Sequence, residues 1–345
     1  MERVRGLKVL IGVAMVALTG LFVAACGGSD DDSSEGSNGV TKAELLLPFN
    51  ESISFYPLLV ARDQGYLEKE GVEVESVVAD SGASVVQQLT AGNVDYGVTN
   101  AENILIGASR GAPLRAVSEL NSGVFTIAAP TDSDVKSSAD LEGAAVGLTV
   151  ATGGEVPLVN AVLEDNDLKV NEDVETPVVG PGGPAVYSAF ENGTIDAYAG
   201  AGNDLAGVIA EGLELEPILD DKYADLPANF LVVTQETLDD DSKRETAMKI
   251  GRAWNEAVQF TIDNPKEAME ITCEAVPEDC QNKAAAQAYF DSTVETYAPP
   301  ENGPMGQPDT DGLNTLLETI VADDLAGDVN LEETFPETYL DEQQP

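Results

Sequence analysis

The sequence predicts an α/β protein built from two lobes. Apolar runs of strand length alternate with helical patterns from residue 41 onward, which is typical of a largely parallel sheet covered by helices. The first two pairs are a strand at 43–47 with a helix at 57–69, and a strand at 72–78 with a helix at 84–91. A helix-to-strand unit then recurs 101 residues later. Together, the alternation and the repeat predict two lobes of the same plan.

The repeated unit is a helix that ends in glycine and leads into a short strand. The first copy holds Gly82, Val85, Leu89, Gly92, Val94 and Asp95, and the second holds Gly183, Val186, Phe190, Gly193, Ile195 and Asp196. In both copies the apolar residues fall at helical spacing, and a glycine follows in the position of a left-handed cap. The alternative is coincidence between two ordinary helix-to-strand units, because glycine after a helix is common.

The N-terminus has the pattern of an export signal. Arg3, Arg5 and Lys8 precede an apolar run over residues 9–25, which stops at Cys26. Small residues before this cysteine resemble the bacterial lipobox, so we expect residues 1–25 to be a lipoprotein signal peptide and Cys26 to carry lipid. A plain transmembrane anchor is the alternative, since a span needs roughly 17–25 apolar residues. Residues 26–40 contain almost only small and polar side chains and are expected to form a flexible tether.

Composition excludes several classes of function. The formal net charge is −45, so nucleic acid and anionic lipid surfaces are not expected as partners. The chain contains no histidine, which removes the usual general base, the Ser-His-Asp and Cys-His arrangements and every histidine-ligated metal site. We therefore expect no catalytic residues, no metal and no cofactor.

Two cysteines remain beyond Cys26. Cys273 and Cys280 stand seven residues apart around a proline-containing segment. In an exported protein such an even pair favours a local disulfide. Two free thiols on a helical surface are the alternative.

A glycine-bearing turn marks the second lobe. A predicted strand at 145–149 ends at Ala151, Thr152, Gly153 and Gly154, and a helix follows at about 155–164. Backbone N–H groups at such a helix N-terminus can face a ligand. The turn lacks the Lys-Ser/Thr ending of a phosphate loop, and an ordinary strand-to-helix connection is the alternative.

An ordered set of short motifs resembles one family of transport proteins. The run FYPLLVARDQGYL at 55–67 is followed by GVEVE at 71–75, LTAGNVDYG at 89–97, GAPLRAV at 111–117, DLEG at 140–143 and NGTIDA at 192–197. This set resembles the nitrate, sulfonate, taurine and thiamine-pyrimidine binding proteins of ABC importers. The resemblance spans about residues 41–265 and becomes looser toward the C-terminus, where Pro299 and Pro300 interrupt the helical pattern.

The resemblance implies a periplasmic-binding-protein fold of the second type, with a ligand cleft between two α/β lobes. Lobe one would comprise 41–122 plus 225–345, and lobe two 123–224, with crossing strands at 124–129 and 228–233. The protein would be a monomer on the outer face of the membrane, anchored through Cys26, that binds a small molecule by lobe closure. It would deliver this molecule to the transmembrane permease subunits of an ABC importer.

Two other classes of function compete with transport. A pyrimidine-synthase branch of the same fold is enzymatic, but it depends on a catalytic histidine that this chain lacks. A surface adhesion or signalling module could also reuse the fold. We therefore expect a binding protein and not an enzyme.

The loops expected at the cleft suggest the ligand. They lie at strand C-termini and helix N-termini and comprise residues 48–56, 80–84, 99–102, 121–123, 149–155, 180–184 and 200–204, with no lysine or arginine. This favours a neutral or weakly basic heteroaromatic, such as a thiamine-pyrimidine precursor. Nitrate, taurine or another alkanesulfonate remains the alternative, because backbone N–H groups can bind an anion alone. The candidate contacts are Asn50, Tyr56, Ser81, Asn100, Thr152, Gly153, Glu155 and Asn203.

Overall fold

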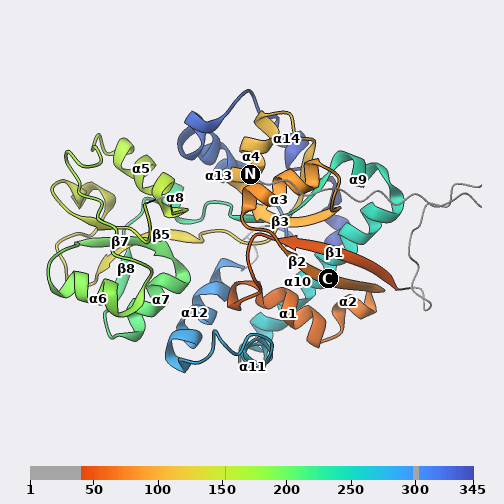
Figure 1. The fold of residues 1–345 in the computed structure, drawn as a ribbon, viewed down its shortest axis with the longest axis horizontal. Helices are drawn as coiled ribbons and strands as arrows, with labels where there is room; N and C mark the ends of the chain where they lie inside the picture. The colour runs from red at the N-terminus through yellow and green to blue at the C-terminus, as the bar shows by residue number, and fades with distance from the viewer. Residues whose placement is uncertain (1–39, 152, 298–302) are drawn as a thin grey trace, which may run out of the picture. The chain divides into compact units, whose positions relative to one another are not determined.

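The first sheet contains five strands, three of which form its parallel half. The computed structural model describes residues 40–151, 153–297 and 303–345. The strands are β1 (Thr41–Leu47), β2 (Val72–Val78), β3 (Tyr96–Asn100), β4 (Leu114–Glu119) and β9 (Asn229–Thr234), in the spatial order β2-β1-β3-β9-β4. β1 runs parallel to β2 and β3, whereas β9 runs antiparallel to β3 and β4. A strand from late in the chain therefore lies inside a sheet that is otherwise N-terminal (Figure 1).

Helices from two separate stretches of the chain accompany this sheet. They are η1 (Ile53–Phe55), α1 (Tyr56–Asp63), α2 (Tyr66–Lys69), α3 (Gly82–Thr90), α4 (Ala101–Ser109), α9 (Gln235–Asp239), α10 (Asp241–Asp263) and α11 (Pro265–Ala275). The single helix expected at 57–69 is two helices. Gly65 adopts a φ of 73°, and this left-handed conformation ends α1 and redirects the chain into α2.

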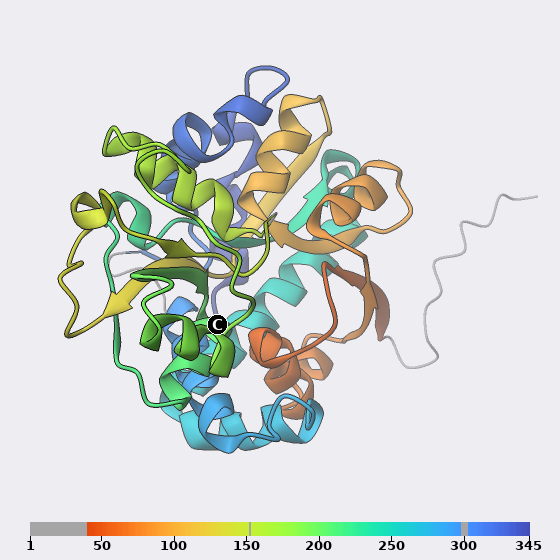
Figure 2. The same ribbon diagram turned by 60° about the vertical axis from the view of Figure 1, so that its left-hand side comes forward.

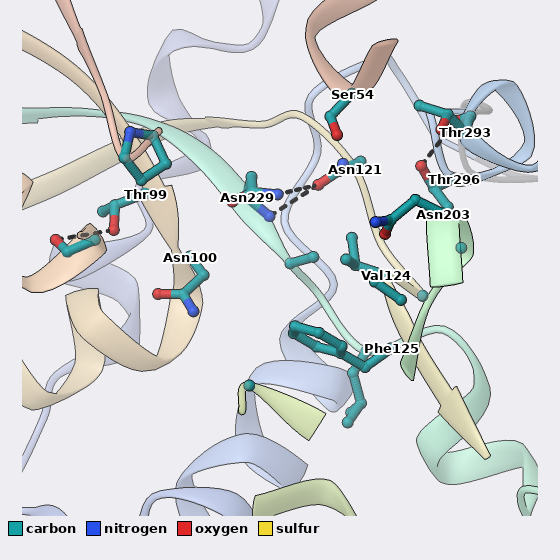
Figure 3. A pocket seen from close by; sticks show the side chains of 18 of the residues that line it. Ser54, Thr99, Asn100, Asn121, Val124, Phe125, Asn203, Asn229, Thr293 and Thr296 are labelled. Carbon is teal, nitrogen blue, oxygen red and sulfur yellow. Dashed lines mark hydrogen bonds between the residues drawn. The ribbon is translucent and has the colours of Figure 1, made fainter. Parts of the chain in front are cut away.

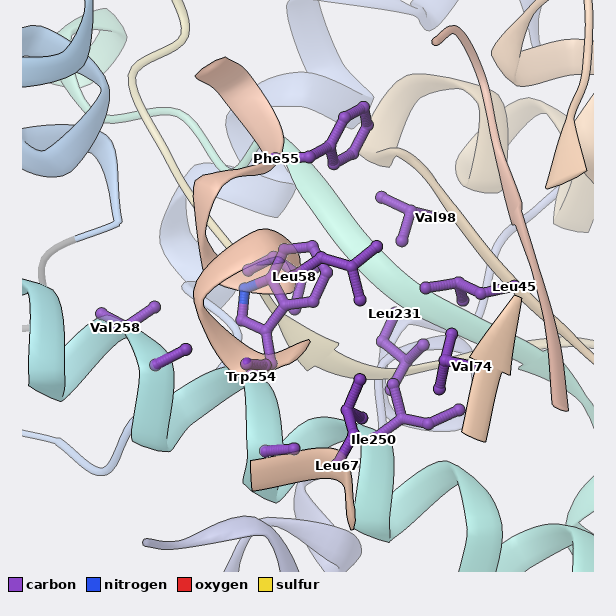
Figure 4. Close-up of a cluster of buried hydrophobic side chains, with 14 of the residues drawn as sticks. Leu45, Phe55, Leu58, Leu67, Val74, Val98, Leu231, Ile250, Trp254 and Val258 are labelled. Atoms are coloured by element: carbon purple, nitrogen blue, oxygen red, sulfur yellow. The ribbon is translucent and has the colours of Figure 1, made fainter. Parts of the chain in front are cut away.

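The core of the first lobe lies between α1, α10 and the sheet. Ile250, Trp254 and Val258 recur every fourth residue of α10, so they share one face of that helix. Figure 4 shows this face against Leu58 of α1 and Leu231 of β9. Burying each large apolar side chain stabilises the fold by about 1.5–3 kcal/mol relative to exposure.

The second sheet is formed by the middle of the chain. Its strands are β5 (Phe125–Pro130), β6 (Val146–Gly147), β7 (Ala197–Ala201) and β8 (Leu215–Pro217), in the order β6-β7-β5-β8. Its other elements are η2 (Ser138–Leu141), α5 (Glu155–Asp165), α6 (Gly183–Glu191), α7 (Gly202–Ala210) and α8 (Asp221–Ala224). It has core clusters of its own, including Ile127, Val162 and Tyr198.

Two neighbouring segments connect the sheets. Ser122 and Pro227 form an isolated antiparallel bridge, and the Gly123 N–H donates to the Leu226 carbonyl at 2.9 Å. The strands that follow, β5 and β9, begin one residue later than the crossing strands expected from the sequence. The exact lobe boundaries stay a prediction, which this distribution of strands supports.

The 101-residue repeat extends further than the sequence pattern indicated. α3, β3 and α4 are matched by α6, β7 and α7, and each pair has its first and last residues 101 positions apart. Gly92 and Gly193, which follow the first helix of each copy, have φ values of 70° and 65°. The two copies are therefore the same helix-strand-helix unit.

The C-terminal segment packs on both parts of the protein. Its elements are α12 (Lys283–Thr296), α13 (Thr310–Thr315), η3 (Leu316–Ile320), η4 (Ala322–Asp324), α14 (Leu331–Thr334), η5 (Glu337–Tyr339) and η6 (Asp341–Gln343). Phe290 of α12 belongs to the first core, yet α12 also packs directly against α7 (Figures 1 and 2). The buried Gln343 donates to the Val117 carbonyl at 2.7 Å and so fixes the chain end on β4.

A disulfide joins Cys273 to Cys280, with 5.6 Å between their Cα atoms. It links the last turn of α11 to the segment that precedes α12. Among the described residues, no helix is both long and apolar enough to cross a bilayer. The predictions for the signal peptide, the tether and Cys26 concern residues outside the described ranges.

Candidate ligand-binding site

A cavity of about 840 Å³ is lined by residues of both sheets. Ligand pockets for small organic molecules have volumes of roughly 300–1,000 Å³. The first sheet and its helices contribute Ser81, Thr99, Asn100, Glu102 and Asn229, and the second contributes Phe125, Gly154 and Asn203. Figure 3 shows several of these side chains around the shared space. The cavity therefore lies where the loops of the two lobes were expected to meet.

The crossing segments supply one wall. The Asn121 side-chain oxygen accepts hydrogen bonds from the Asn229 backbone N–H at 2.9 Å and from its side-chain amide at 3.0 Å. Both residues line the cavity, and Figure 3 shows the pair in place. The wall is thus made of hydrogen-bonded amides at the point where the chain passes between the sheets.

The N-terminus of α4 forms a second wall. Asn100 caps the helix, and its Oδ1 accepts from the Asn103 backbone N–H at 3.3 Å and from the Asn103 side chain. Thr99 donates to the Gly82 carbonyl at 3.2 Å. Since capping occupies the oxygen of Asn100, its amide nitrogen is the atom that remains for a ligand.

Glu102 lies in the first turn of the same helix. The side chain as a whole is only partly exposed, and its Oε2 atom is buried without a hydrogen-bond partner. Burial raises the pKa of Glu102 to about 7. An unpartnered buried oxygen is costly, so this carboxyl group is a strong candidate for contact with a ligand.

The N-terminus of α7 faces the cavity from the second lobe. Asn203 is exposed there, whereas the neighbouring Asp204 is buried and accepts from the Ala201 N–H at 3.0 Å. Desolvation raises the pKa of Asp204, the Ala201 hydrogen bond lowers it, and nearby Glu155 raises it. Asp204 therefore holds the helix N-terminus, and Asn203 is the side chain available to a ligand.

The α3 N-terminus and the disulfide loop complete the lining. Ser81 caps α3 by accepting from the Ser84 N–H at 3.2 Å. Asp279, inside the disulfide loop, accepts from the Ile53 N–H at 3.0 Å, and Ser54 bonds to Tyr289 of α12. These contacts join segments more than 200 residues apart in the chain.

Some predicted contacts lie away from the cavity. Asn50 lines a separate shallow depression with Arg62 and Ser76. Tyr56 is fully buried and packs against Phe290 and Tyr297, with ring centroids 5.4 and 5.2 Å away. Its aromatic neighbours therefore explain Tyr56 as a core residue.

The residues of the glycine-bearing turn have different roles. Gly154 lines the cavity beside the Phe125 ring, whereas Gly153 and Glu155 do not belong to the lining. Glu155 is 2% exposed and accepts from both the N–H and the hydroxyl of Thr149. These bonds hold the turn in place from inside the lobe. Thr152 lies outside the described residues.

Of the predicted contacts, the structure brings together Ser81, Asn100 and Asn203. Sequence reasoning did not select Glu102, Asn121, Phe125 or Asn229 as contacts. The repeat could have identified Glu102, because it stands 101 residues before Asn203. Asp279 and the α12 residues carried no such signal.

The described lining of the cavity combines apolar and aromatic side chains with hydroxyl, amide and carboxyl groups. Its described lining contains Asp80, Glu102 and Asp279 but neither lysine nor arginine. The described residues also hold no group of three or more histidine, cysteine, aspartate or glutamate side chains that could bind a metal ion. Such a lining can bind a ligand by hydrogen bonds and stacking.

Solved and curated proteins resemble the chain over most of its length. The periplasmic aliphatic sulphonate binding protein SsuA from Escherichia coli superposes with a TM-score of 0.63, covering 85% of this chain and 91% of that one at 15% identity. This likeness confirms the periplasmic-binding-protein fold. The formylaminopyrimidine-binding protein of Halalkalibacterium halodurans is 23% identical over 88% of this chain and 91% of its own.

A shorter match involves an enzyme. The 4-amino-5-hydroxymethyl-2-methylpyrimidine phosphate synthase of Uromyces fabae is 27% identical over 85 residues, a quarter of each chain.

The model of the NMT1/THI5-like family matches residues 52–268. This range is more than half of the sequence and includes the α3–β3–α4 unit, β5, β9 and most of the residues that line the cavity. The chain therefore belongs to the NMT1/THI5-like family.

Proposed function

We propose that the protein is the extracytoplasmic solute-binding component of an ABC importer, and that it acts without catalysis. The observation that carries the proposal is the cavity of about 840 Å³, whose lining comes from both sheets. The two crossing segments lie at its wall. A rotation about them would enclose a ligand, as in other hinged domain closures.

The lobes of this proposal are residues 41–122 plus 225–345 and residues 123–224. The preferred ligand is a neutral or weakly basic heteroaromatic of the thiamine-pyrimidine precursor type. Phe125, beside Gly154, supplies an aromatic ring to the cavity, and several asparagines belong to the same lining. Nitrate, taurine and other alkanesulfonates are the competing ligands.

The proposed cellular setting follows from the N-terminal sequence. Lipid on Cys26 would hold a monomer at the outer face of the membrane, close to the permease. The intact mass of the protein extracted from the membrane fraction tests the anchor. A mature N-terminus other than a lipid-modified Cys26 would contradict it.

The function itself is tested by the solute that the protein carries. Protein purified from its natural medium is denatured, the released small molecules are weighed by mass spectrometry, and uptake of the identified solute is measured in cells. Asn203→Phe, which places a ring in the cavity, should abolish both binding and uptake. Asn192→Phe is the matched control, because Asn192 is also an exposed asparagine but does not line the cavity.

Two results would contradict the proposal. One is that no small molecule is released and uptake is the same with and without the protein. The other is chemical conversion of the bound solute, which would point to the enzymatic branch of the fold.

A further inference from the structure

Glu102 and Asn203 occupy equivalent positions in the two copies of the repeat. Each is the second residue of its helix, α4 or α7, and they are 101 residues apart. Both line the same cavity. The cavity therefore lies between two copies of one turn, with a carboxyl group at one side and an amide at the other.

One oxygen of the Glu102 carboxyl group lacks a hydrogen-bond partner within the protein. Glu102 Oε2 is buried and makes no hydrogen bond. Asp279, another acid of the lining, accepts from the Ile53 N–H, and Asp80 lies exposed in the loop before α3. No lysine or arginine belongs to the described lining, so no basic side chain there neutralises the carboxylate form of Glu102.

We propose that Glu102 recognises the ligand, and that the ligand is a protonated nitrogen base whose N–H group donates to its carboxylate while Asn203 contacts the ligand from the second lobe. The inference rests on the proposed function, since it concerns the solute held in the same cavity. A charge-assisted hydrogen bond in a desolvated site is about twice as strong as a neutral one. The pairing would give the buried Glu102 Oε2 atom a hydrogen-bond partner and would neutralise the charge of the carboxylate.

The same geometry disfavours an anion. A sulfonate or nitrate in this cavity would lie near Glu102, Asp80 and Asp279 without a basic side chain among the described lining residues. Like charges in a desolvated cavity repel strongly. The α4 N-terminus favours negative charge, but the carboxylate form of Glu102 already supplies one at that position.

Titration calorimetry on the mature protein tests the pairing with matched probes. One pair is 4-amino-5-hydroxymethyl-2-methylpyrimidine and its 4-oxo analogue, and the other is benzamidine and neutral benzamide. We expect the wild type to prefer the basic member of at least one pair by about tenfold or more. Glu102→Gln should weaken the basic probe about 10- to 100-fold, the range expected for a lost charged hydrogen bond, and the neutral probe less than about threefold.

Glu119→Gln is the control variant. Glu119 is also a largely desolvated glutamate, with its pKa raised to about 8, but it bonds the Asp309 N–H and does not line the cavity. It should leave both probes unchanged. Thermal unfolding of each variant verifies that the fold is retained.

Three outcomes would overturn the inference. Equal weakening of basic and neutral probes by Glu102→Gln would assign the residue a structural role only. Tightest binding of taurine or nitrate would exclude a cation. Release of a natural solute that is not a base would refute the ligand class while leaving the proposed function intact. If no solute is released and uptake is the same with and without the protein, the proposed function is contradicted as well.

Discussion

Asn121 accepts two hydrogen bonds from Asn229 through one oxygen, at 2.9 Å from the backbone and 3.0 Å from the side chain. The two residues flank the crossing segments 108 positions apart, and the backbone N–H of Ala228 also donates to the Asn121 carbonyl at 2.9 Å. This pair ties the outgoing and returning chains at the cavity wall. It should therefore affect both stability and ligand binding.

Asn121→Ala removes the acceptor that two partly buried donors of Asn229 share. We expect a loss of about 1–3 kcal/mol in the free energy of unfolding, measured by urea denaturation, together with weaker binding of the released solute. Asn93→Ala removes an exposed side-chain hydrogen bond to Gln88 and should change stability by less than about 0.5 kcal/mol. Equal effects of the two substitutions would contradict a special role for the pair.

Gly123→Ala should be costly at the crossing for two reasons. Gly123 has a φ of 61° and an added Cβ would lie 3.0 Å from the Ala224 carbonyl oxygen. The left-handed conformation costs about 1–2 kcal/mol for a residue with a Cβ, and the contact adds to it.

Gly92→Ala isolates the first of these costs, because Gly92 has a φ of 70° and open space around it. Both variants should lower the melting temperature. We expect only Gly123→Ala to alter the change in radius of gyration that X-ray scattering detects on ligand saturation. A larger effect from Gly92→Ala would refute this assignment of the hinge.

The stability of the ligand-free protein should fall as pH rises from about 5 to 8.5. Desolvation raises the pKa of Glu102 to about 7 and that of Glu119 to about 8, above their unfolded values near 4.3. The folded state therefore binds more protons in this window, and the stability present below the unfolded pKa is lost as pH rises through the folded values. The loss should be of the order of a few kcal/mol for each group, because one pKa unit corresponds to about 1.4 kcal/mol.

Urea denaturation at several pH values checks this slope. The double variant Glu102→Gln/Glu119→Gln should have a flatter profile. Asp140 and Asp240, whose pKa values backbone hydrogen bonds lower, act only below about pH 4 and with opposite sign. A profile that rises between pH 6 and 8, or a double variant with an unchanged slope, would show that the two glutamates do not control it.

Removing the disulfide should destabilise the protein and disturb one cavity wall. For a loop this short the chain-entropy model gives about 2–3 kcal/mol. Cys273→Ser/Cys280→Ser should lower the free energy of unfolding by that amount and also weaken ligand binding, because Asp279 and its bond to Ile53 lie in the loop. In the native wild type both cysteines should resist alkylation until reductant is added, and ready labelling without reductant would contradict the disulfide.

The fold was predictable because its signals are local. Apolar periodicity and the glycines after α3 and α6 define the repeat, and the structure confirms the α/β class and the fold implied by the resemblance. The break at Gly65 was harder to see, since the residues on both sides of it keep a helical pattern. A single left-handed residue decides between one helix and two.

The site was predictable only in part, because tertiary contacts decide which face of an element is buried. Asn100 and Asn203 stand at strand ends, where position along the chain indicates the cavity. Tyr56 is polar and aromatic, but α12 covers it with Phe290 from the far end of the chain. No local pattern shows that α12 lies there, nor that it also touches α7.

The matching helix-strand-helix units also bear on the history of the protein. Duplication of an ancestral gene for one lobe would leave such a correspondence, in which Glu102 and Asn203 take equivalent positions in their helices. Each half of the binding cavity could then acquire new side chains while the other half kept its contacts with the ligand. A change of specificity would require mutation in one copy only, which makes this architecture easy for selection to retune.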